Sequence, residues 1–150
     1  MSKSSAARRG HATRWLYQQE ARVLKFNKEA MRRRPIEELR AIARKIWKVE
    51  GSKRKLPNIY ATNGLWDAKA PWDNRKQKGK WTSFCLGYSH IELARHHRTL
   101  LVLIHELTHA LGPCIHGPRF VSLYFRLLHK YAGYNRWFLQ FVAAERNITI

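Results

Sequence analysis

The chain is poor in cysteine and in acidic residues, and it contains no long apolar run. Its two cysteines, Cys85 and Cys114, are too few for a zinc site of four thiolates or for the disulfide framework of a small secreted protein. No stretch of about 18 apolar residues exists to cross a membrane, and the N-terminus lacks the apolar core of a secretory signal. We therefore expect an intracellular protein, in the cytoplasm, nucleoid or nucleus, with no membrane partner.

The shortage of acids leaves 10 Asp and Glu against 29 Lys and Arg, a formal net charge of +19. A field this positive attracts phosphate backbones through counterion release, so nucleic acid is the leading expected partner, with DNA favoured. Residues 1–55 carry a net +12. The acid-free stretch before Glu20 also resembles a mitochondrial presequence, which leaves a mitochondrial location open beside a viral particle. A solvated basic surface, an acidic protein or an anionic membrane would account for the same charge.

Two basic runs are the expected contacts with nucleic acid. One closes the first helical region, and the other lies in a loop that also contains Trp66 and Trp72. Cations beside aromatic rings can contact phosphates while bases stack on the rings. The side chains that we expect to bind nucleic acid are Arg32, Arg33, Arg34, Arg75, Lys76, Lys78 and Lys80.

The length of 150 residues fits one domain, and the periodicity of the apolar residues predicts an α+β fold. Residues 1–11 are small, polar and basic, which predicts a disordered arm. Pro35 is expected to separate two basic helices, and Gly51 to end the second. Within the single domain 12–150 we expect basic helices in 12–50, strands and the basic loop in 56–93, helices carrying the functional site in 97–131, and a helix packed on the core in 133–146.

The most informative motif is His105-Glu106-Leu107-Thr108-His109. On a helix, His105 and His109 lie four residues apart and about 40° around the axis, so both imidazoles can reach one metal ion. Glu106 is then placed to take a proton from a metal-bound water, which would turn that water into a nucleophile for an amide carbonyl. The apolar residues before and within the motif predict a buried helix.

A third ligand is needed, and its position separates the classes of zinc protease. The metzincin spacing would place a histidine at position 115, but that residue is Ile115, and no methionine follows to form a Met-turn. Glu145, the only acid after Glu106, remains a minor alternative. Cys114 is a second alternative, although a small buried residue is its commoner role. His116 lies in the turn after the helix and is the remaining candidate.

The combination of this motif with His116-Gly117-Pro118-Arg119-Phe120 resembles the SprT-like (Spartan-type) zinc metalloproteases, over roughly residues 81–130. The resemblance implies a zincin-like fold, with helices packed on a small, mainly antiparallel sheet and the His-Glu-x-x-His sequence on the active-site helix. It also implies Zn²⁺ as cofactor, held by His105, His109 and His116, and Glu106 as general base. Many members carry a C-terminal zinc ribbon, for which this chain has neither the cysteines nor the length, so it resembles a minimal form.

These observations predict a zinc-dependent endopeptidase that cuts protein substrates bound to or near nucleic acid. A transition-state oxyanion would need a hydrogen-bond donor besides zinc, and the candidates are Tyr88, Tyr124, Tyr131 and Arg119. The alternative is a non-enzymatic basic protein that binds nucleic acid or belongs to a nucleoprotein particle, with zinc holding only its fold.

Overall fold

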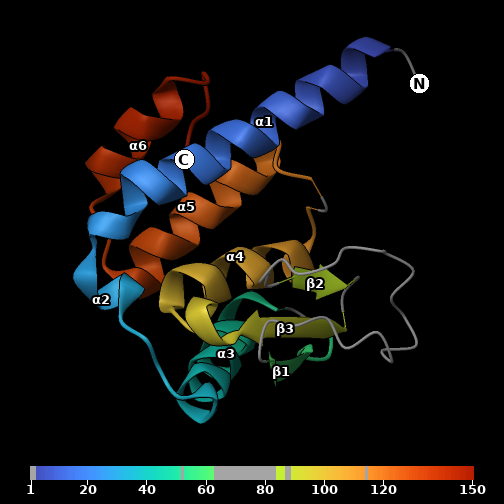
Figure 1. Cartoon of the computed structure of the whole chain (residues 1–150), viewed down its shortest axis with the longest axis vertical. Helices are drawn as coiled ribbons and strands as arrows, with labels where there is room; N and C mark the ends of the chain where they lie inside the picture. Colours follow the sequence, from blue (N-terminus) through green and yellow to red (C-terminus); the bar gives the residue numbers. More distant parts are fainter. Residues whose placement is uncertain (1–2, 52, 63–83, 87–88, 114) are drawn as a thin grey trace.

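The computed structural model describes residues 3–51, 53–62, 84–86, 89–113 and 115–150 (Figure 1). Helices dominate these residues, and three short strands form one sheet. In chain order the elements are α1 (Lys3–Arg22), the 3-10 turn η1 (Leu24–Phe26), α2 (Lys28–Met31), α3 (Ile36–Glu50), β1 (Asn58–Thr62), β2 (Phe84–Leu86), β3 (His90–Ala94), the 3-10 turn η2 (Arg95–His97), α4 (Leu100–Leu111), α5 (Pro118–Ala132) and α6 (Arg136–Ala144). The expectation of an α+β fold is confirmed.

The sheet has the order β1-β3-β2 and is mixed. β1 runs parallel to β3 over its whole length, whereas the shorter β2 is antiparallel to β3. The expectation of a mainly antiparallel sheet is therefore wrong. Parallel neighbours need a long crossover between them, and the residues between β1 and β3 are numerous enough to provide one. β2 lies at one edge of the sheet and β1 at the other.

Helix α4 lies at the centre of the domain, in contact with α2, α3, α5, β2 and β3 (Figure 1). It is apolar nearly all round, which is typical of a helix buried on every side, and Leu103, Ile104 and Leu107 are fully buried. Thr99 caps its N-terminus by accepting a hydrogen bond from the backbone N–H of Val102 at 3.3 Å. The cap and the surrounding core hold α4 in one position, which matters because the histidine motif is part of it.

The N-terminal region differs from the prediction. Residues 3–11, expected as a disordered arm, are the first part of α1, since the helix begins at Lys3. Alanine and arginine are strong helix formers, so this short basic stretch can extend the helix despite Gly10. The first basic helix also ends at Arg22, earlier than expected, and η1 and α2 follow it. The second basic helix is confirmed as α3, which begins after Pro35 and ends before Gly51.

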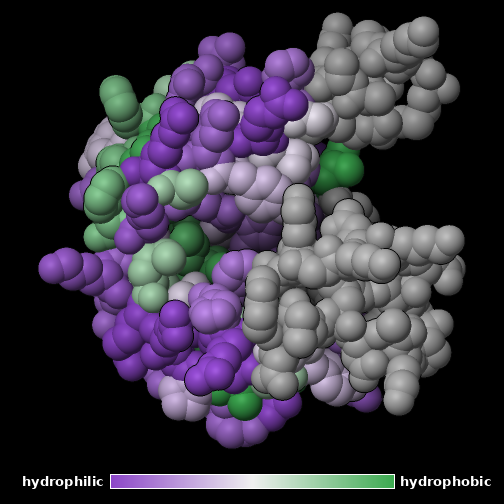
Figure 2. Space-filling view, viewed as in Figure 1, coloured by the Kyte–Doolittle hydropathy of each residue, from purple (hydrophilic) through white to green (hydrophobic). Residues whose placement is uncertain are grey.

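Helix α6 packs on the core by one face only. Leu139, Val142 and Ala143 are buried, but Trp137 is 83% exposed and Phe141 80% exposed. Figure 2 shows green, hydrophobic residues among the purple ones on the side of the molecule where Figure 1 places α6 and α2. The helix expected in 133–146 is thus present and packs on the core, but Trp137 and Phe141 take no part in that packing. No helix in the described part of the chain combines the length and the apolarity needed to span a bilayer.

This arrangement predicts that the two faces of α6 differ in their effect on stability. Replacing Trp137 or Phe141 with Ala should change the free energy of unfolding by no more than about 0.5 kcal/mol, as for an ordinary surface position. Leu139→Ala should cost about 2–5 kcal/mol, because it leaves a cavity in the core. Urea unfolding of the three variants measures the difference, and a large loss for Trp137→Ala would contradict the packing described.

Candidate metal centre

Three histidines converge at the C-terminal half of α4. His105 and His109 come from α4, and His116 comes from the turn between α4 and α5. The Nε2 atom of His116 lies 3.0 Å from Nε2 of His105 and 3.0 Å from Nε2 of His109. Ligand nitrogens about 2.0–2.1 Å from a tetrahedral zinc ion would be roughly 3.3 Å apart, so the spacing fits a single ion. Within the described ranges, this is the one group of three or more potential ligand side chains that could hold a metal ion.

The outer nitrogen of each imidazole has a partner of its own. Nδ1 of His105 lies 2.7 Å from Oε1 of Glu20, and Nδ1 of His109 lies 3.0 Å from the carbonyl oxygen of Pro113. Nδ1 of His116 lies 3.2 Å from the hydroxyl of Thr13. A carbonyl and a carboxylate only accept hydrogen bonds, so His105 and His109 donate through Nδ1–H, which leaves Nε2 as the atom that can bind a metal ion. Nitrogen lone pairs converging at this distance favour a cation between them, and the donor set therefore fits a metal ion.

Burial and neighbouring charged groups shift the pKa values of the three histidines. Burial, followed by the neighbouring His105, lowers the pKa of His109 to about 4. The same causes, with His109 as a further one, lower the pKa of His116 to about 3. For His105, burial disfavours the charged form, but the carboxylate of Glu20 outweighs it and the net shift of the pKa is upward. His109 and His116 are thus neutral near physiological pH, as metal ligands must be.

Glu106 follows the first histidine and is almost completely buried, with 6% of its surface exposed. Burial raises the pKa of its carboxyl group to about 7, against the opposing effect of His105 and with a smaller contribution from Glu20. A carboxyl group with a pKa near 7 is well matched to proton transfer at neutral pH. Its place on α4 beside His105 is the one expected of the general base.

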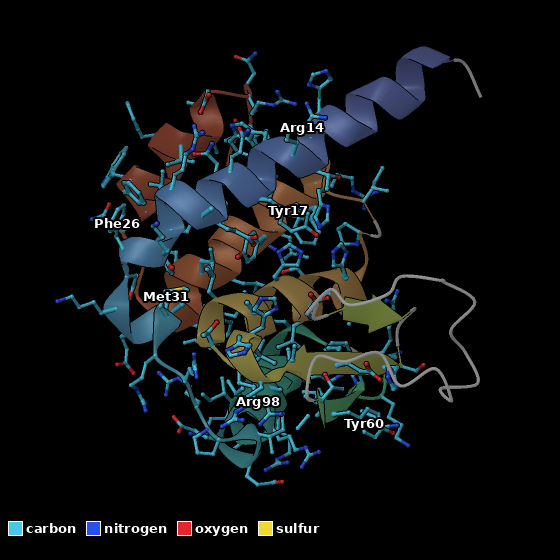
Figure 3. The ribbon with its side chains drawn as sticks, viewed as in Figure 1. Arg14, Tyr17, Phe26, Met31, Tyr60 and Arg98 are labelled. Carbon is cyan, nitrogen blue, oxygen red and sulfur yellow. The ribbon has the colours of Figure 1, made fainter. Side chains whose placement is uncertain are left out.

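Tyr17 lies over the histidines, between α1 and α4 (Figure 3). Its ring is stacked on that of His105, with centroids 5.9 Å apart, and meets the edge of His116 at 5.3 Å. About half of the residue, 51%, remains exposed. Burial of the rest and the carboxylates of Glu20 and Glu106 raise the pKa of Tyr17 to about 12. The phenol is thus a protonated hydrogen-bond donor near the centre.

Among the described residues, the three donors expected from the sequence, Tyr124, Tyr131 and Arg119, have other surroundings. Tyr124 is fully buried and donates to Oε1 of Glu20 at 2.8 Å. Tyr131 donates to Glu50 at 2.7 Å. Arg119 lines a groove on the outer side of the α4–α5 turn, and Tyr88 lies outside the described residues.

The alternative ligands lie apart from the three histidines or outside the description. Glu145 accepts a hydrogen bond from Nε1 of Trp15 at 3.3 Å and is not one of the clustered ligands. Ile115, which holds the metzincin position, is 55% exposed. Cys114 is outside the described residues.

The residues expected to contact nucleic acid differ in their exposure. Arg34 is buried and forms ion pairs with Glu29 and Glu38, and the exposed Arg32 pairs with the same two carboxylates. Arg33 lies 3.4 Å from Nδ1 of His96. Arg34 is therefore tied into the fold, whereas Arg32 and Arg33 stay on the surface. Arg75, Lys76, Lys78 and Lys80 lie outside the described residues.

Three side chains at the site that no sequence motif indicated come from α1. Thr13, Tyr17 and Glu20 follow each other at intervals of four and three residues, so they share one face of the helix. The only local sign was that Glu20 is the single acid in α1. No protein-family model, curated protein or solved structure matches this chain. The described residues thus define an α+β domain with a three-histidine centre that can hold a metal ion.

Proposed function

We propose that this protein is a zinc-dependent endopeptidase of the SprT-like type, acting on proteins bound to or near nucleic acid. The observation that carries the proposal is the convergence of three Nε2 atoms at α4, the helix that also carries the buried Glu106. Three imidazoles match the protein ligand set of catalytic zinc, which leaves the fourth tetrahedral position for water or substrate. Tyr17, which is 51% exposed, lies against two of these imidazoles.

Zinc bound by His105, His109 and His116 would supply a water of lowered pKa and polarise the substrate carbonyl. Glu106 takes the proton from the attacking water and passes it to the nitrogen of the departing amine. Tyr17, held against His105 and His116, donates a hydrogen bond to the oxyanion that forms on the carbonyl oxygen.

The substrate backbone has a matching surface at the edge of the sheet. Among the described strands, β2 lies at one edge of the sheet, and it contacts α4, the helix that carries His105 and Glu106. An extended peptide added to such an edge gains main-chain hydrogen bonds that do not depend on its sequence. Nucleic acid would bring protein substrates to this edge through the overall positive charge, which includes the exposed Arg14 and Arg22 of α1.

Metal analysis and a cleavage assay test this proposal together. Freshly purified protein is expected to contain about one zinc ion per chain. It should cleave an unfolded protein substrate, more rapidly when substrate and enzyme share a DNA strand, and a zinc chelator should stop the reaction. Zinc without cleavage would favour the alternative of a structural site in a basic nucleic-acid-binding protein. If the purified protein contains no bound metal, both the zinc peptidase and the structural zinc site are contradicted.

Replacing Tyr17 with Phe tests the proposed oxyanion donor. The variant keeps the ring that stacks on His105, so zinc content and KM should stay close to the wild type. Its kcat should fall roughly 10²-fold, as expected for loss of one oxyanion donor. Tyr60→Phe is the matched control, because Tyr60 stacks on His90 in the sheet instead. An unchanged kcat for Tyr17→Phe would remove this tyrosine from the mechanism.

A further inference from the structure

Helix α1 is basic, yet it carries one acid that points inward. Glu20 is the single acidic residue between Lys3 and Arg22, and only 18% of its side chain is exposed. A buried carboxylate is expensive unless it has charged or hydrogen-bonding partners. Its Oε1 atom has two, Nδ1 of His105 at 2.7 Å and the hydroxyl of Tyr124 at 2.8 Å. Glu20 therefore contacts a histidine of the candidate metal centre and is not part of the exposed basic surface of α1.

The contact with Glu20 determines which ring nitrogen of His105 faces the other two histidines. Because the carboxylate accepts from Nδ1–H, the opposite nitrogen, Nε2, is left as the atom that can bind a metal ion, and it lies 3.0 Å from Nε2 of His116. Tyr124, fully buried on α5, fixes the carboxylate from the other side. A histidine that donates to a carboxylate is held in one ring orientation and becomes a more basic ligand.

Two further contacts come from the same face of α1. Thr13 reaches Nδ1 of His116, and the ring of Tyr17 lies against both His105 and His116. The helix therefore touches two of the three ligands, although it is more than 80 residues distant from them in the chain. Any ion that orders the three histidines also orders the surface on which α1 packs.

We propose that Glu20 is a positioning residue for His105, and that metal binding at the three histidines locks α1 onto the domain. The inference rests on the metal centre of the proposed function. Binding that requires a docked helix stabilises the docked form by mass action, so metal occupancy and α1 docking rise together. In this arrangement α1 lines one side of the site, and its docking there is stabilised when the metal is bound.

Zinc affinity, measured by competition with a chromogenic chelator, tests the role of Glu20. Glu20→Ala should weaken binding about 10- to 100-fold, as for loss of an outer hydrogen-bond partner of a metal ligand. Glu20→Gln should lose less, because its amide oxygen still accepts from Nδ1–H. Gln18→Ala, an exposed change two residues away, is the matched control and should bind as the wild type does. The visible spectrum of the Co²⁺ form should change in Glu20→Ala and stay unchanged in Gln18→Ala.

Hydrogen exchange tests the locking of α1. Adding zinc to the metal-free wild type should slow exchange of the α1 amides at least about 10-fold, and Glu20→Ala should lose most of this protection at saturating zinc. Wild-type zinc affinity in Glu20→Ala, or equal α1 exchange with and without zinc, would overturn the inference. Those results would leave the proposed peptidase intact if the wild type binds zinc and cleaves protein. If the wild type binds no zinc, both this inference and the proposed peptidase are wrong.

Discussion

Glu106→Gln is expected to lower the rate of protein cleavage by about 10²- to 10⁴-fold, the usual contribution of a positioned general base. The amide is nearly the size of the carboxyl group but cannot accept the proton of the attacking water. Because Glu106 is not one of the three clustered ligands, zinc content should remain that of the wild type. The neutral amide also fits a site in which burial already raises the pKa of the acid to about 7, so the fold should tolerate it.

The experiment compares initial cleavage rates and zinc content in Glu106→Gln and Glu145→Gln. Glu145 is bonded to Trp15 and lies apart from the clustered histidines, so its variant should keep both rate and zinc. The pair also decides the minor alternative for the third ligand, since loss of zinc from Glu145→Gln would make that residue a ligand. Cleavage at the wild-type rate by Glu106→Gln would exclude this carboxyl group as the base.

The parts of the site that share one helix could be predicted from the sequence. His105 and His109 meet because their spacing matches one turn of α4, and the apolar residues between them predict its burial. His116 needed more than periodicity, since the turn that brings it back depends on residues after α4. Its assignment came from the resemblance of the whole motif to a known family, and the structure places its Nε2 atom beside the other two.

Contacts between distant segments could not be predicted in the same way. Glu20 and His105 are 85 positions apart, and no local pattern specifies that α1 packs on α4 and α5. The isolation of one acid in a basic helix was a signal, but a surface salt bridge would have explained it as well. The direction of β1 had no local signal at all, because the alternation of side chains is the same in parallel and antiparallel strands.

Arg34 is a residue for which the local sequence predicted exposure and the fold produces burial. Three consecutive arginines predict a basic surface patch, but Glu38 stands four residues after Arg34 and Glu29 five before it. The i to i+4 spacing of opposite charges is a known helical pair, but Arg34 precedes α3, which begins at Ile36, so helix periodicity did not predict the ion pair with Glu38. The burial of Arg34 could not be predicted either, because it depends on the chain segments that cover this residue, among them Arg98, whose carbonyl accepts the Arg34 backbone N–H at 2.8 Å.

His116→Ala is expected to abolish zinc retention and cleavage together. Removing one of three protein ligands leaves two imidazoles on α4 with no third nitrogen to close the site. The affinity loss should exceed about 100-fold, the upper value for losing only an outer partner of a ligand. It should therefore also exceed the loss in Glu20→Ala. Zinc per chain after gel filtration, together with chelator competition, measures both.

Cys114→Ala is the control for this experiment, because Cys114 is the neighbouring side chain that could replace His116 as a ligand. Zinc retained by Cys114→Ala and lost by His116→Ala would establish the three-histidine set. The reverse result would overturn it, and loss in both variants would indicate a site with four protein ligands. Four ligands leave no position for water, so that outcome would favour a structural zinc over the peptidase. The two substitutions thus decide both the identity of the ligands and whether the centre is open to a substrate.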